Sequence, residues 1–240
     1  DGGPAVEASF KRPQGLALDS AGNLYIADRL NHRIRKLSPD GVMTTVAGNG
    51  SAGFSGDGGP AVEASLASPW GVFVDSAGNL FIADTENNRI RKVDAAGVIT
   101  TVAGTGHFGF EGDGGPATAA RLAYPRAVIA DGAGNLYIGD GNNRRVRKVD
   151  VSGAIWTVAG VGLGVDPGDG GPATAAVLGY PVGLALDSEG NLFIAEMLAG
   201  SVRKIDRGNV ITTVAGNGIR GHSGEGGPGW LSQIGGAYAL

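Results

Sequence analysis

The chain has 240 residues, with 45 glycines, 11 prolines and no cysteine, and a formal net charge of −4 at pH 7. Apolar residues make up 42% and charged residues 18%, which fits a protein with a core rather than a disordered one. The lack of cysteine excludes disulfides and thiolate chemistry. The acidic balance argues against nucleic acid as a partner. No apolar run approaches the length of a membrane span, so none is expected.

A short Gly-rich stretch recurs along the whole chain. Copies of Asp-Gly-Gly-Pro or Glu-Gly-Gly-Pro begin at residues 1, 57, 113, 169 and 225, a constant spacing of 56. A period of this length is typical of a repeat array. We expect one domain over residues 1–240, with a partial repeat at the C-terminal end. The repeats are about 1–56, 57–112, 113–168 and 169–224, followed by 225–240.

The second repeat shows what one unit contains, in chain order. Trp70–Asp75 predicts a first strand, and Ser76–Asn79 carries the Gly and Asn of a tight turn. Leu80–Asp84, Arg89–Asp94 and Val98–Ala103 predict three more strands. Four strands with short connections predict an antiparallel meander. The Asp before each tight turn is interpreted as a cap of its own hairpin.

The second strand of each unit is apolar on both faces, which requires a sheet packed against each side. The long segment between meanders predicts a tight turn and one helical turn. These features predict an all-β protein, a β-propeller of four-stranded antiparallel blades with four full blades and the start of a fifth. A linear β-solenoid is the alternative, although its repeats are usually shorter.

The repeat resembles a known family. PQGLALDSAGNLYIADRLNHRIRK at residues 13–36 and PWGVFVDSAGNLFIADTENNRIRK at residues 69–92 are similar to the NHL repeat. The third unit is looser, and the fourth loses the pattern at residues 196–201. The resemblance implies a β-propeller, commonly of six blades. The DGGPA linkers resemble those of secreted bacterial NHL proteins, which implies an extracellular or cell-envelope location.

Three units share an Asp/Asn/Arg set in the loop after the second strand. Because a catalytic site is needed once and this set occurs three times, we interpret it as a loop stabilised by carboxylate–guanidinium hydrogen bonds. The set comprises Asp28, Asn31, Arg33, Asp84, Asn87, Arg89, Asp140, Asn143 and Arg145.

Residues that differ between units indicate a ligand site. Gln14, Trp70 and Arg126 stand just before successive first strands, where the inner strands of a propeller surround the channel mouth. An aromatic ring beside a guanidinium suits a sugar, a peptide or a carboxylate. The linkers add three further candidates, Phe54, Phe110 and His107.

Three functions remain open from the sequence. The first is a non-enzymatic binding or scaffold module for a protein or glycan. The second, implied by propellers related to the family, is a metal-dependent lyase or lactonase with its site in the channel. The histidines occupy non-equivalent positions and the inner strands carry apolar residues, so no catalytic residue, metal or cofactor is expected.

The third function is a structural subunit completed by another chain. Residues 225–240 align with residues 1–16, so both segments would compete for one place in a closed four-bladed ring. We therefore expect an incomplete propeller whose unpaired blade faces promote self-association.

Overall fold

Short runs of β-branched and aromatic residues, separated by turns with Gly and Asn, form four antiparallel sheets. The computed structural model describes the whole chain, residues 1–240. The first blade contains β2 (Pro13–Leu18), β3 (Leu24–Asp28), β4 (Arg33–Leu37) and β5 (Val42–Ala47), with β1 (Gly3–Pro4) paired to β5. The second contains β6 (Val72–Val74), β7 (Leu80–Asp84), β8 (Arg89–Val93) and β9 (Ile99–Ala103). The third contains β10 (Pro125–Ala130), β11 (Leu136–Asp140), β12 (Arg145–Val149) and β13 (Ile155–Ala159). The fourth contains β14 (Pro181–Leu186), β15 (Leu192–Glu196), β16 (Ser201–Ile205) and β17 (Ile211–Ala215).

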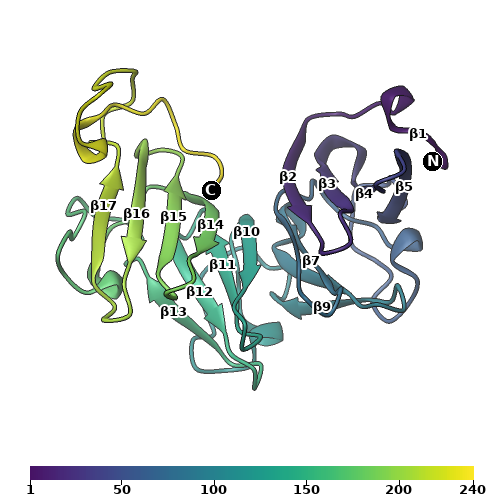
Figure 1. Cartoon of the computed structure of the whole chain (residues 1–240). Helices are drawn as coiled ribbons and strands as arrows, with labels where there is room; N and C mark the ends of the chain where they lie inside the picture. The colour runs from purple at the N-terminus through teal and green to yellow at the C-terminus, as the bar shows by residue number, and fades with distance from the viewer.

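The four blades lie around a common axis, which makes a four-blade β-propeller and confirms the predicted fold class (Figure 1). The inner strand of each blade lies at one edge of its sheet. Inner strands of consecutive blades contact one another, β2 with β6, β6 with β10 and β10 with β14. These edges therefore line the axis in order from β2 to β14.

The hydrophobic core is divided among the interfaces between blades. Between the second and third blades, Phe81, Ala83 and Ile90 pack in one cluster with Leu136 and Ile138. Similar clusters join the first blade to the second and the third to the fourth. The second strands of the two inner blades, β7 and β11, are apolar on both faces, and a neighbouring sheet covers each face.

The repeated Gly-rich stretch connects two blades, as predicted. Its first part pairs with the outer strand of the blade that follows: the Gly58 N–H donates to Ile99 O at 2.7 Å. Its second part, the 3-10 turn η3 (Ala61–Glu63), returns to the preceding blade, where the Gly48 N–H donates to Ala61 O at 2.9 Å. Each connector thus fixes the position of one blade relative to the next.

Equivalent 3-10 turns recur in the other connectors. They are η1 (Ala5–Glu7), η5 (Ala117–Ala119), η6 (Ala173–Ala175) and η7 (Gly229–Leu231), whereas η2 (Arg29–Asn31) and η4 (Thr85–Asn87) follow second strands. Every helix in the chain is a single short turn, and none has the length and apolar character needed to cross a membrane.

The C-terminal segment follows the path of a connector onto the fourth blade. The Gly216 N–H donates to Gly229 O at 3.0 Å, and the Asn217 N–H donates to Ser232 O at 2.8 Å. Ala239 then lies against Gly183 of β14, as Gly71 at the start of the second blade lies against Gly15 of β2. Residues 237–240 therefore occupy the position of a further inner strand.

The first blade is covered on one face only. Leu16 and Leu18 are 61% and 68% exposed, whereas their counterparts Val72 and Val74 in the second blade are 7% and 8% exposed. The side chains that a preceding blade would cover are therefore in contact with solvent.

One glycine is required by a close approach between backbones. Gly104 follows β9 with φ +93°, and a Cβ on this residue would overlap the carbonyl oxygen of Asn88. Gly97, in a hairpin turn of the same blade, has φ +80°, but a Cβ on it would have no heavy atom within 4 Å. The two positions share a left-handed conformation and differ in packing.

We predict that Gly104→Ala destabilises the chain more than Gly97→Ala. The Gly97 variant should lose about 1–2 kcal/mol through the left-handed conformation alone. The Gly104 variant should lose about 1–3 kcal/mol more because of the backbone overlap. Urea unfolding of both variants measures the difference, and equal losses would contradict the packing argument.

Candidate ligand site at the channel mouth

The inner strands of all four blades surround a cavity of about 460 Å³ on the axis. Residues 14–18, 70–74, 126–130 and 182–186 line it, together with residues 238–240. Most of these side chains are apolar, and Arg126 is the one with a formal charge. Of the predicted ligand-binding residues, Gln14, Trp70 and Arg126 are thus brought together.

Arg126 is the centre of an aromatic cluster at one end of this cavity. Its Cζ lies 4.1 Å from the centroid of the Trp70 ring and 4.7 Å from that of Tyr180. Arg29 approaches Trp70 as well, with its Cζ 4.8 Å from the ring centroid. The contacts with two rings hold the half-buried guanidinium by cation–π attraction.

The sequence did not indicate Tyr180, Arg29 or Met197 as part of this cluster. Tyr180 has a left-handed backbone, with φ +71°, directly before the first residue of β14. Its hydroxyl donates to Asn142 Oδ1 in the preceding blade. One sequence feature could have indicated Tyr180. It directly precedes the Pro that starts an inner strand, at the position that Ser68 and Tyr124 occupy in earlier units.

Arg126 has no carboxylate partner. One of its amino groups lies 3.7 Å from Met197 Sδ, and its buried Nε has no acceptor. Burial lowers the pKa of the Arg126 guanidinium from its ordinary value, and the neighbouring Arg29 lowers it further. A guanidinium remains charged at neutral pH even so, so this end of the cavity is positively charged.

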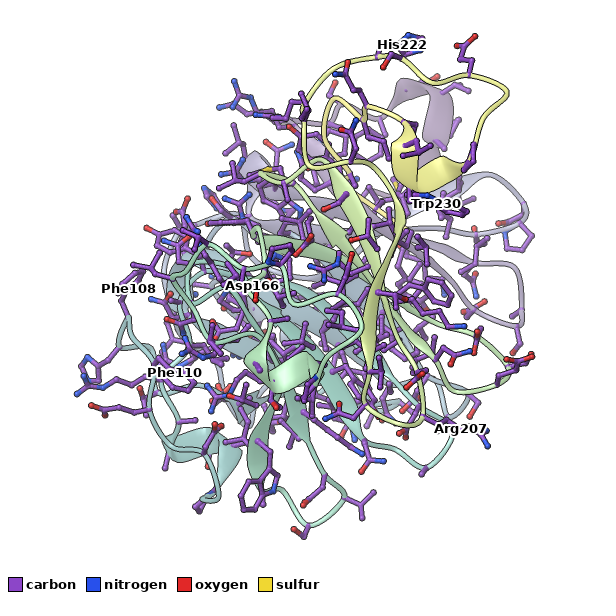
Figure 2. All side chains as sticks on the ribbon, turned by 90° about the vertical axis from the view of Figure 1, so that its left-hand side faces the viewer. Phe108, Phe110, Asp166, Arg207, His222 and Trp230 are labelled. Carbon is purple, nitrogen blue, oxygen red and sulfur yellow. The ribbon has the colours of Figure 1, made fainter.

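The other predicted ligand residues lie elsewhere. Phe54 covers the guanidinium of Arg89 with 3.7 Å between Cζ and the ring centroid, and Phe110 covers Arg145 at 3.8 Å. Both rings therefore pack on the loop set instead of lining the cavity. His107 is exposed on a connector. Figure 2 shows Phe108, the residue after His107, projecting outward from the molecule.

The cavity has no donor set for a divalent metal. No Asp, Glu, His or Cys side chain lines it, and no group of three or more such residues anywhere in the chain is arranged to hold an ion. Metal sites in proteins use these side chains. The residues present therefore do not fit the metal implied for a channel-centred lyase or lactonase.

The loop set forms a carboxylate network in which the partner arginine is not the predicted one. Asp84 is fully buried, and its oxygens accept hydrogen bonds from the Ala67 N–H and from Asn87 Nδ2, both at 2.7 Å. The guanidinium near Asp84 belongs to Arg91, at 3.4 Å. Arg89 donates instead to the carbonyls of Asn87 and Thr105.

Arg91 also pairs with the Asp of the repeated Gly-rich stretch. Its Nη2 lies 2.7 Å from Asp57 Oδ1, and the Arg91 side chain is fully buried. The register with β9 shifts beside this arginine: Ile90 pairs with Ala103 and Arg91 with Thr101, so β9 has one extra residue. The same triad and the same shift occur in every blade, with partners Arg35–Asp28–Asp1, Arg147–Asp140–Asp113 and Arg203–Glu196–Asp169.

The fourth blade keeps this network with different residues. Glu196 replaces the Asp, and its Oε1 accepts from the Gly179 N–H at 2.8 Å. The Ser201 hydroxyl donates to Glu196 Oε2 at 2.6 Å and so takes the place of the Asn amide. The loss of the sequence pattern at residues 196–201 is therefore compensated in the structure.

The hairpin Asp residues cap their own turns, as predicted. Asp75 Oδ1 accepts hydrogen bonds from the N–H groups of Ala77 and Asn79, and Asp75 Oδ2 accepts one from the Asn79 side chain. The equivalent Asp19, Asp131 and Asp187 make the same contacts. These carboxylates therefore stabilise turns.

We predict that Asp84→Ala lowers the free energy of unfolding by about 3–5 kcal/mol, because it leaves the buried Arg91 without one of its two carboxylates. The control is Asp94→Ala. Asp94 is an exposed turn residue that accepts two backbone hydrogen bonds, and its loss should cost about 1 kcal/mol or less. Chemical unfolding measures both, and a native-like stability of the Asp84 variant would contradict the assignment.

The buried carboxylates also predict a pH dependence of stability. Burial raises the pKa of Asp84 to about 6 and that of Asp140 to about 7, from an ordinary value of 3.8. Between about pH 4 and 7 the folded chain therefore binds more protons than the unfolded chain. The free energy of unfolding should then fall as pH rises through this window. The turn residues Asp19, Asp131 and Asp187 have lowered pKa values and titrate below it.

Urea unfolding between pH 4.5 and 8 tests this dependence. The unmodified chain should lose stability across the range, and Asp140→Asn should lose less because one titrating carboxyl is absent. If the free energy of unfolding changes with pH in the same way in both proteins, Asp140 is ionised in the folded state throughout this range.

Comparison with known proteins agrees with the repeat pattern. The NHL repeat profile matches residues 10–37, and the Teneurin NHL domain profile matches residues 50–111. The chain is thus an NHL-repeat β-propeller. Human Teneurin-1 is 30% identical over 233 residues, which cover 86% of this chain and 8% of that protein. The Arabidopsis thaliana protein SUPPRESSOR OF QUENCHING 1, chloroplastic, is 27% identical over 274 residues, which cover 85% of this chain and 26% of that protein.

Solved structures share the fold at lower identity. A Bacteroides thetaiotaomicron protein of unknown function has a TM-score of 0.64 and 24% identity, over 79% of this chain and 46% of that one. A streptogramin B lyase has a TM-score of 0.58 and 15% identity, over 86% of this chain and 55% of that one. The chain spans about half of these structures and a small part of the sequence relatives.

Proposed function

We propose that the chain is a non-enzymatic binding module that takes a protein or glycan ligand at the channel mouth through Trp70 and Arg126. The observation that carries this proposal is the guanidinium of Arg126, held by two rings and without a carboxylate partner at one end of an open cavity. Aromatic and arginine side chains are the residue types that contribute most to binding energy at interfaces.

The comparisons support a module role. The match covers 8% of human Teneurin-1, so the propeller is one part of a much longer chain in that relative. An extracellular or cell-envelope location belongs to the same proposal, supported by the resemblance of the linkers to those of secreted NHL proteins. A lyase or lactonase activity has less support, because the fold likeness is at 15% identity and the cavity has no metal donors.

We predict that Trp70→Ala combined with Arg126→Ala weakens ligand binding by at least about tenfold in screens against glycan arrays and peptide libraries. The matched control is Trp156→Ala with Arg207→Ala, which removes the same residue types away from the cavity. Trp156 is 50% exposed on β13, and Figure 2 shows Arg207 on the opposite side of the molecule from Phe108. Ligand binding that survives the first double variant and is lost in the control would contradict the site.

A second candidate function, a structural subunit completed by another chain, is favoured by the exposed face of the first blade. Leu16 and Leu18 would be covered by a neighbouring blade, and exposed apolar faces promote association. We predict that native mass spectrometry detects oligomers that Leu16→Lys with Leu18→Glu reduces. The control is Val151→Glu, at a loop valine that is 74% exposed. A monomer at all concentrations would contradict this role.

A further inference from the structure

The arginines of this chain differ in how their charge is balanced. Arg91, Arg147 and Arg203 are buried, and each lies between two carboxylates. Arg126 is half-buried and has no carboxylate partner; the side-chain acceptors beside it are neutral, with Met197 Sδ at 3.7 Å and the Tyr180 hydroxyl next to it. A partly desolvated guanidinium without an anion has an unsatisfied hydrogen-bonding capacity.

The surroundings of Arg126 increase this positive charge. Arg29 contacts the same Trp70 ring, and its buried Nε has no acceptor. Glu86 lies 4.0 Å from Arg29, at the limit of an ion pair. No acidic side chain lines the cavity. An anion in the cavity would therefore meet the Arg126 guanidinium and no acidic side chain in the lining, and Arg29 adds positive charge on the other contact of the Trp70 ring.

The walls below Arg126 favour one kind of ligand. Because β2, β6, β10 and β14 are sheet edges, alternate backbone N–H and C=O groups along them face the axis without a strand partner. The Gly15 N–H at the start of β2 is an exception, since it donates to Trp70 O at 2.8 Å. An extended peptide can pair with such an edge. Sugar hydroxyls are usually bound by side-chain carboxylates and amides, and Gln14 is the one lining side chain of that kind.

We propose that the channel mouth recognises a carboxylate carried by an extended peptide, with the carboxylate on the Arg126 guanidinium and the adjoining main chain along a free inner-strand edge. This inference rests on the proposed function and names the ligand class for the same site. The carboxylate comes from one of two sources, the free C-terminus of the peptide or the side chain of an Asp or Glu within it. A bidentate arginine contact suits both.

The experiment measures fluorescence anisotropy with three amino-terminally labelled octapeptide libraries. The first has neutral side chains and a free C-terminal carboxylate, the second has one central aspartate and an amidated terminus, and the third has neutral side chains and an amidated terminus. Each library is tested with the unmodified chain, Arg126→Ala, Arg126→Lys and the control Arg207→Ala. Circular dichroism verifies that each variant is folded.

We expect one or both carboxylate libraries to bind at least about tenfold more tightly than the neutral amidated library. The first library binding alone identifies the C-terminus as the source, and the second alone identifies the acidic side chain. Arg126→Ala should remove the preference for carboxylate libraries. Arg126→Lys should reduce it, because an ammonium group replaces the planar, bidentate guanidinium. Arg207→Ala should leave it unchanged.

Equal binding of all three libraries, with loss in the Trp70 and Arg126 double variant, would overturn the carboxylate preference and leave the channel-mouth site in place. Binding of glycans with no binding of any peptide library would also overturn it. Binding that is the same in every variant would instead contradict the proposed function. The comparison of the two carboxylate libraries with the neutral amidated library uses the unmodified protein. Its result is therefore independent of the folding of any variant.

Discussion

The structure depends on a buried guanidinium that holds three segments of each blade together. In the second blade, Arg91 of the third strand lies between Asp84, at the end of the second strand, and Asp57, in the connector that precedes the blade. A fully buried arginine is costly unless both its charge and its hydrogen bonds are satisfied. The connector and the second-strand loop are therefore fixed in position wherever this arginine is buried, and the repeated Asp before Gly-Gly-Pro is needed in each unit.

This interaction explains which parts of the fold could be predicted from the sequence. The strands and turns follow from local patterns, so Leu80–Asp84 and Arg89–Val93 were expected at nearly the observed bounds. The choice between Arg89 and Arg91 could not be made in this way. Both lie on one face of a strand, two residues apart, and their depth between the packed segments decides which is buried.

Part of the candidate site was also predictable from local position in the repeat. Trp70 and Arg126 were found because residues that start inner strands must surround the axis, whatever their type. Phe54 and Phe110 were placed with them by position in the linker, but each ring covers an arginine of the loop set. Tyr180 was missed because its left-handed backbone directs the side chain toward a neighbouring blade, and sequence periodicity does not report such a direction.

The uncovered face of the first blade has a consequence for local unfolding of the protein. In an array, the stability of each unit is the sum of its own contacts and those with its nearest neighbours. The third blade is packed on both sides, whereas the first is packed only against the second. Residues 1–47 should therefore cost less to unfold locally than the third blade. Amide hydrogens of β2 to β5 would then exchange with solvent through a partly unfolded state in which β10 to β13 remain folded.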